Sequence, residues 1–217
     1  MDFYYQNLQK IKKKDLSKEL NEIAHSLSNS QVEIELLPDK GVSIEIAKLY
    51  KKHNGKKVIG SIPKSDKTFG INHLKEYINF LDIEENSLFD EIIDSGDWFK
   101  HDLIKGLLGD VVLYLGSSPG TEGELNYATY LFKLFKGLKK YIDTPSEKVH
   151  KEIRAGKNMP FTYFIYRPFI KNNQLSFETE AYLEKVGINL IYIDNPAHLQ
   201  KELLKLQKNN FTQKNVL

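Results

Sequence analysis

VVLYLGSSPGTEGELNYA, the stretch from Val111 to Ala128, decides the fold that we expect. Its first part, 111–115, is apolar and predicts a buried strand. A turn of small residues follows, and Thr121 is expected to open a long helix over 121–140. Small residues at a strand-to-helix turn let backbone N–H groups approach a ligand, and the helix N-terminus adds a partial positive charge. The stretch therefore predicts a phosphate-binding turn with several available N–H groups, which gives a ligand class but no reaction.

The rest of the chain alternates between helical and strand patterns. Apolar residues at helical spacing predict helices around 16–27, 42–50, 74–81, 99–107, 178–186 and 196–208, and apolar or alternating runs predict strands over 32–37, 57–62, 161–166 and 189–193. Strands separated by helices imply parallel βαβ units with right-handed crossovers. We therefore expect an α/β fold, a Rossmann-like three-layer sandwich with a mostly parallel sheet.

The length of 217 residues suits a single domain. We expect that domain over 15–208, with an N-terminal arm over 1–14 and a frayed tail over 209–217. Ligands in such folds bind outside the carboxyl ends of the strands. The turns expected at that edge are 38–43, 63–66, 94–101 and 116–121.

The composition excludes several classes of protein. The chain has no cysteine, which excludes disulfides, thiolate catalysis and cysteine-ligated metal. Its net charge of +2 is too small to indicate nucleic acid or a membrane surface as a partner. No apolar run approaches the roughly 20 residues of a membrane span, and the first residues lack the order of a signal peptide. We therefore expect a cytoplasmic protein.

Two neighbouring segments resemble a known family. IDSGDWFKH over 93–101, followed by GDVVLYLGSSPGTEGE over 109–124, is similar to the core of the LOG-like Rossmann superfamily, formerly labelled "lysine decarboxylase-like". That superfamily includes molybdenum-cofactor carrier proteins and DNA-processing DprA-type domains. Its hallmark is Gly-Gly-x-Gly-Thr-x-x-Glu after an apolar strand, and Gly120, Thr121 and Glu124 match it.

The resemblance implies a ligand and a reaction. Members bind nucleotides or related phosphorylated ligands, and the LOG enzymes hydrolyse the N-glycosidic bond of nucleoside 5′-monophosphates. Carried over, Gly120 and Thr121 would bind phosphate, and Glu124 would be catalytic. The family's upstream arginine falls on His101 here, and its first Gly-rich loop is replaced by Pro38-Asp-Lys-Gly-Val-Ser43. Hydrolysis is therefore expected to be weakened.

The predicted site combines these residues with nearby cations. Its ligand-binding set is Ser117, Ser118, Pro119, Gly120, Thr121, Lys40, Gly41 and Lys64, and its catalytic candidates are Glu124 and His101. Only two arginines occur in the chain, and Arg167 is better placed than Arg154 to reach a ligand or a subunit partner. The other histidines show no ligand spacing, so no metal site is expected.

Two alternatives stay open at the site. Thr121 to Glu124 also forms a Thr-x-x-Glu capping box, in which both side chains would serve the helix end. His101 is either a binding or acid/base group at the sheet edge or a solvated residue near a helix start.

The function expected from these patterns is binding of a nucleotide or another phosphorylated ligand, as a sensor or carrier. The alternative is a nucleoside 5′-monophosphate phosphoribohydrolase. The resemblance also implies a homodimer, and neither a membrane nor nucleic acid is expected as a partner.

Overall fold

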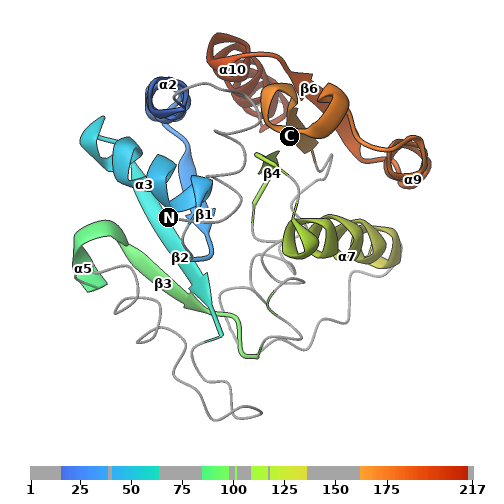
Figure 1. Cartoon of the computed structure of the whole chain (residues 1–217), viewed down its shortest axis with the longest axis horizontal. Helices are drawn as coiled ribbons and strands as arrows, with labels where there is room; N and C mark the ends of the chain where they lie inside the picture. Colours follow the sequence, from blue (N-terminus) through green and yellow to red (C-terminus); the bar gives the residue numbers. More distant parts are fainter. Residues whose placement is uncertain are drawn as a thin grey trace.

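The computed structural model describes residues 16–38, 41–63, 85–97, 101, 109–116, 118–135 and 162–214 (Figure 1). In chain order the elements are α2 (Ser17–Asn29), β1 (Glu33–Leu36), α3 (Val42–Lys52), β2 (Lys57–Ile62), α5 (Glu85–Leu88), β3 (Glu91–Asp94), β4 (Val111–Tyr114), α7 (Pro119–Phe135), β5 (Thr162–Tyr166), the 3-10 turns η1 (Arg167–Phe169) and η2 (Lys171–Asn173), α9 (Phe177–Val186), β6 (Asn189–Ile193) and α10 (Pro196–Lys214). No helix in the described ranges is long and apolar enough to span a membrane.

The strands form two parallel sheets, ordered β1-β2-β3 and β4-β5-β6. In the first, Ile34 lies opposite Val58 of β2; in the second, Val112 lies opposite Tyr163 of β5. If the two sheets are set side by side with β1 next to β4, their strands follow the Rossmann order 3-2-1-4-5-6. The predicted α/β class with parallel strands is confirmed.

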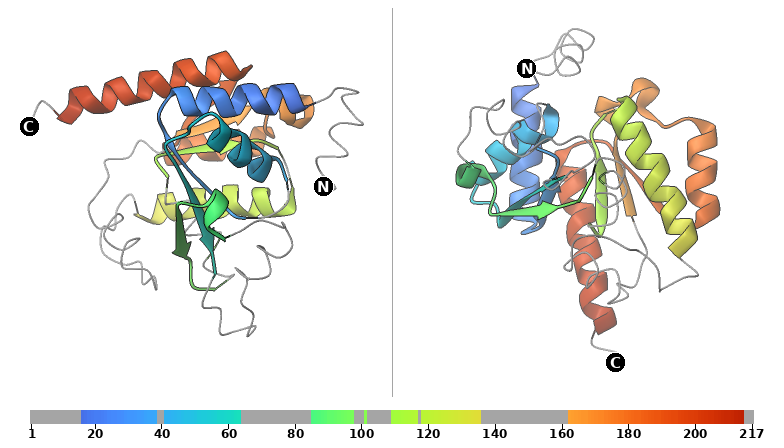
Figure 2. Two further views of the ribbon diagram at one scale, coloured as in Figure 1. Left: turned by 90° about the vertical axis from the view of Figure 1, so that its left-hand side faces the viewer. Right: turned by 90° about the horizontal axis from the view of Figure 1, so that it is seen from below.

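The central strand β5 shows why the molecule has three layers. All five of its residues are buried, and successive side chains point to opposite faces of the sheet. Phe164 and Tyr166 join a hydrophobic cluster with residues of α2, α3 and α10, whereas Tyr163 and Ile165 join a cluster with residues of α7 and α9. Figure 2 shows β4 and β5 between these two groups of helices. Helices therefore cover both faces, as parallel sheets require.

Several boundaries differ from the prediction. Strand β3 and the four-residue helix α5 were not expected, because EIID over 91–94 is short and acidic at both ends. Pairing of β3 with β2, which the sequence pattern does not show, makes it a strand. Helix α10 extends to Lys214, so the helix includes most of the predicted tail. The arm over 1–14 and the helix over 74–81 lie outside the described residues, as does the helix over 99–107 apart from His101.

Candidate functional site

The candidate site follows β1 and β4, which each form one edge of a sheet and lead into a helix. In a doubly wound sheet, ligands bind outside the carboxyl ends of the strands where the strand order reverses. The chain leaves β1 towards α3 and leaves β4 towards α7, so a helix N-terminus follows each of these two strands. Gly41 is the N-cap of α3 and, as a glycine, has no side chain that could cap the helix.

Helix α7 begins two residues earlier than predicted, with Ser118 at its N-cap. Ser118 Oγ accepts the Thr121 N–H at 3.2 Å, and Thr121 Oγ1 accepts the Ser118 N–H at 2.8 Å. The two hydroxyls also hydrogen-bond to each other at 2.7 Å. Pro119 occupies the first helical position, where proline is favoured. The reciprocal capping box is therefore Ser118-Pro-Gly-Thr121, and the prediction that Thr121 begins a Thr-x-x-Glu box is wrong.

This cap changes what Glu124 can do. The Thr121 N–H goes to Ser118, so Glu124 does not complete a capping box with it. Burial raises the pKa of Tyr163 well above its usual range, the Thr129 hydroxyl lowers it, and the charge of Glu124 raises it. Glu124 thus lies within electrostatic reach of β5.

The neighbouring carboxylate, Glu122, has a partner of its own. Its Oε1 accepts a hydrogen bond from Tyr114 OH at 2.8 Å. Tyr114 is the last residue of β4 and is buried, so this bond ties the first turn of α7 to the end of the strand.

Among the described residues of the first turn of α7, one backbone donor has no partner. Between 118 and 121, the N–H groups of Ser118 and Thr121 are used by the cap, and proline has none. The Gly120 N–H has no hydrogen-bond partner within the described part of the chain. This is fewer than the several donors expected from the sequence.

The two glycines of the early α7 turns meet open space. A Cβ added at Gly120 would find only Ser118 Oγ, at 3.8 Å, and one at Gly123 would find nothing within 4 Å. Glycine in a helix costs roughly 0.5–1 kcal/mol relative to alanine. The fold gains no packing from these two glycines, and their absent side chains leave the backbone accessible. Gly116, by contrast, is required by its φ of 141°.

His101 is buried, so the interpretation of it as a solvated residue is wrong. It is 0% exposed, and its Nδ1 hydrogen-bonds to Ser95 Oγ at 2.8 Å. Ser95 is also fully buried, and its N–H donates to the Ile62 carbonyl at 2.9 Å. His101 follows β3, in the sheet β1-β2-β3, whereas Glu124 lies in α7, which follows β4 of the other sheet.

Arg167 is held by residues near the ends of β5 and β6. Its Nε lies 3.2 Å from Asp194 Oδ1, its Nη1 donates to the Asn173 carbonyl at 3.0 Å, and its guanidinium stacks 4.0 Å from the Tyr192 ring centroid. These contacts give Arg167 a role in fixing the strand ends.

Four residues of interest fall outside the described part of the chain: Lys40, Lys64, Ser117 and Arg154. Their places in the site stay predictions. Among the described residues, no group of three or more His, Asp or Glu side chains is arranged to hold a metal ion. The sequence did contain a signal for Ser118 as the cap, since Ser-Pro-Gly-Thr has a preferred N-cap residue followed by proline.

Comparison with known proteins gives relatives by fold alone. No family model and no curated protein matches the sequence. The molybdenum cofactor carrier protein MCP from Chlamydomonas reinhardtii is similar in structure, with a TM-score of 0.53 and 15% identity over 88% of this chain and 87% of that one. The molybdenum cofactor binding protein from the phototrophic bacterium Rippkaea orientalis gives a TM-score of 0.52 and 13% identity over 88% and 86%. At these identities the likeness shows a Rossmann-like fold.

Proposed function

We propose that this protein binds a small phosphorylated ligand at the carboxyl ends of β1 and β4 and serves as its carrier. The observation that carries the proposal is Gly120. Its N–H is the first-turn donor of α7 that has no partner among the described residues, and Ser118 Oγ is the atom that a Cβ at this position would meet, at 3.8 Å. A helix N-terminus with an available N–H attracts an anion. We place the phosphate of the ligand at the Gly120 N–H.

The N-terminus of α3, which follows β1, supports the same assignment. Gly41, which has no side chain, is the N-cap of α3, so a second positive helix end follows β1. We place Lys40 and Lys64 beside the phosphate, because Glu122 and Glu124 near the α7 turn oppose an anion unless cations compensate. The N-termini of α3 and α7 then flank one ligand.

A carrier role is favoured over an enzyme. The two similar structures are a molybdenum cofactor carrier and a molybdenum cofactor binding protein. That cofactor contains a phosphate, which suits the α7 turn. We infer membership of the LOG-like superfamily, with a nucleotide as the other candidate ligand. Because Glu124 is not held in the helix cap, phosphoribohydrolase activity is the second candidate function.

A pair of substitutions at one position tests the proposal. Gly120→Asp and Gly120→Asn differ in charge but hardly in size. The aspartate interacts favourably with the helix dipole while repelling a bound phosphate. We expect Gly120→Asp to keep or raise the Tm and to abolish ligand-induced stabilisation, whereas Gly120→Asn weakens it less. Thermal shift and calorimetric titration with AMP and with molybdenum cofactor provide the readouts.

Two outcomes would change the assignment. Equal affinity of wild type and Gly120→Asp for either ligand would place the phosphate elsewhere. Release of free base from AMP by the wild type, lost in Glu124→Gln with binding retained, would identify a hydrolase.

A further inference from the structure

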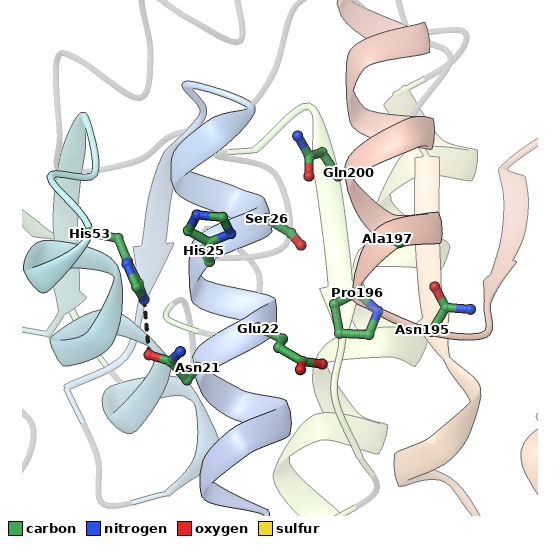
Figure 3. A pocket seen from close by; sticks show the side chains of 9 residues that line it. All are labelled: Asn21, Glu22, His25, Ser26, His53, Asn195, Pro196, Ala197 and Gln200. Carbon is green, nitrogen blue, oxygen red and sulfur yellow. Dashed lines mark hydrogen bonds between the residues drawn. The ribbon is translucent and has the colours of Figure 1, made fainter.

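A groove separate from the α7 turn lies between α2 and α10. The two helices pack against each other on the face of the β4–β6 sheet opposite to α7. The groove is open to solvent and has a volume of about 600 Å³. It is lined from α2, from the N-terminal end of α10 and by His53, which follows α3 (Figure 3). This volume is in the range of small-molecule sites.

Ser26 is the buried polar group in this groove. Ser26 is 4% exposed, and its hydroxyl points from α2 towards α10 in Figure 3. The Ser26 carbonyl accepts from Ser30, but the Ser26 hydroxyl has no hydrogen-bond partner in the described part of the chain. The Ser26 hydroxyl oxygen is not among the buried atoms without a partner, so it keeps contact with solvent and is within reach of a ligand in the groove.

The first turn of α10 adds a backbone donor. Asn195 Oδ1 caps the helix by accepting the His198 N–H at 2.9 Å, and its carbonyl accepts the Leu199 N–H at 3.1 Å. Pro196 has no N–H. Ala197 lines the groove in the first turn of α10, and its N–H has no partner among the described residues. This turn is the positive end of a helix that runs to Lys214.

Two side-chain amides complete the set of donors. His53 Nε2 donates to Asn21 Oδ1 at 2.9 Å, which leaves the Asn21 NH₂ group for the groove. The His53 ring is itself fixed, because it packs edge-on against His25 with ring centroids 5.1 Å apart. The Gln200 amide on α10 also lines the groove and has no recorded partner among the described residues.

We propose that the α2–α10 groove is a second binding site, for a small molecule bearing an oxyanion such as a phosphate or a carboxylate. The Ser26 hydroxyl and the Asn21 and Gln200 amides line it from two helices. Glu22 is the carboxylate among the lining residues, and its charge limits affinity for an anion. The site does not depend on the proposed function, since α7 lies on the other face of the sheet.

Inorganic phosphate and acetate are the probes, and amide NMR is the readout. We expect the Ala197 N–H and the Asn21 and Gln200 side-chain amides to shift together and to saturate at one dissociation constant. The tighter of the two probes identifies the class of oxyanion. The Gly120 amide reports separately on the α7 turn, so failure at one site is distinguishable from failure at the other. If neither probe gives saturable shifts at the groove amides, the proposal is wrong.

Substitutions in the groove should change its affinity for the probes in predicted directions. Ser26→Ala and Gln200→Glu should each weaken binding about tenfold or more, because each removes a donor to a charged ligand. Gln174→Glu, the same change at an exposed residue outside the groove, should leave it unaltered. Glu22→Gln should tighten binding severalfold. If Glu22→Gln weakens binding instead, the groove prefers a cation and the proposal is overturned.

Discussion

Ser118 decides what the α7 turn offers to a ligand. Its hydroxyl accepts a hydrogen bond from the Thr121 N–H, and its own N–H donates to the Thr121 hydroxyl. The Gly120 N–H then has no partner among the described residues. In the sequence, Thr-Glu-Gly-Glu matches the capping-box pattern, whereas Ser-Pro-Gly-Thr offers an N-cap residue followed by proline. The geometry selects Ser-Pro-Gly-Thr, and this choice keeps Glu124 out of the cap.

The hydrogen bond between Tyr166 and Glu19 is the basis of a stability prediction. Tyr166 OH donates to Glu19 Oε1 at 2.9 Å, and both residues are buried. Tyr166→Phe leaves a buried carboxylate without this donor, which should cost about 1.5–3 kcal/mol in the free energy of unfolding. Urea denaturation measures it. Adding Glu19→Gln should recover part of the loss, because a neutral amide is cheaper to bury. No recovery in the double variant would contradict this account.

Asp90 links stability to pH. Partial burial acts to raise its pKa, but hydrogen bonds from Lys51 Nζ and the Val58 N–H outweigh burial and lower the pKa below its usual value. A carboxyl whose pKa is lower in the folded state stabilises the fold above its unfolded pKa of about 3.9. That stabilisation is lost as the pH falls through the folded-state pKa.

Urea midpoints measured from neutral to acid pH test the role of Asp90. Asp90→Asn should be less stable than wild type at neutral pH and should lose less stability below about pH 4. Glu45→Gln removes an exposed ion pair with Lys48 and serves as the matched control, which should follow the wild type. Parallel pH curves for Asp90→Asn and wild type would contradict the assignment.

At the scale of elements, α7 combines a strong cap with two glycines that the fold does not need. Ser118→Ala should destabilise the protein by about 1 kcal/mol, the usual size of an N-cap effect. Gly123→Ala should stabilise it by about 0.5–1 kcal/mol, because the added methyl meets no atom within 4 Å. Thermal and urea unfolding measure both. A destabilising Gly123→Ala would show that the space above α7 is not open in solution.

The sequence predicted elements well where the pattern is local and poorly where pairing makes the element. The pattern at 57–62 predicts β2 with its observed bounds, and the run at 161–166 predicts β5 to within one residue. Strand β3 has only Ile92 and Ile93 between two acidic residues, and its strand character comes from β2. The groove between α2 and α10 joins residues about 170 positions apart, which no local pattern shows.

At the scale of the molecule, the topology divides the predicted site residues. Gly41 follows β1 and Gly120 follows β4, so both lie in turns that the sequence predicted at the carboxyl ends of strands. His101 follows β3, and its burial against Ser95 depends on how the β3 loop folds back on itself. In the sequence, His101 takes the position of the family's upstream arginine because of its distance from Asp110. Distance along the chain does not determine the order of strands in a sheet.

The oligomeric state stays a prediction. The resemblance to the LOG-like superfamily implies a homodimer, and the chain mass is 25.1 kDa. Light scattering at micromolar concentration should therefore give twice the mass of one chain. A mass equal to a single chain at that concentration would remove the homodimer from the account.

The Gly120 amide tests the central claim most directly. The account predicts that titrating a ¹⁵N-labelled sample with molybdenum cofactor or AMP moves the Gly120 N–H resonance downfield, among the largest shifts in the protein. This follows because a charged acceptor replaces solvent at that donor. The same titration of Gly120→Asp should leave the α7 first turn unperturbed. A ligand that raises the Tm of the wild type while the Gly120 resonance stays in place would contradict the account.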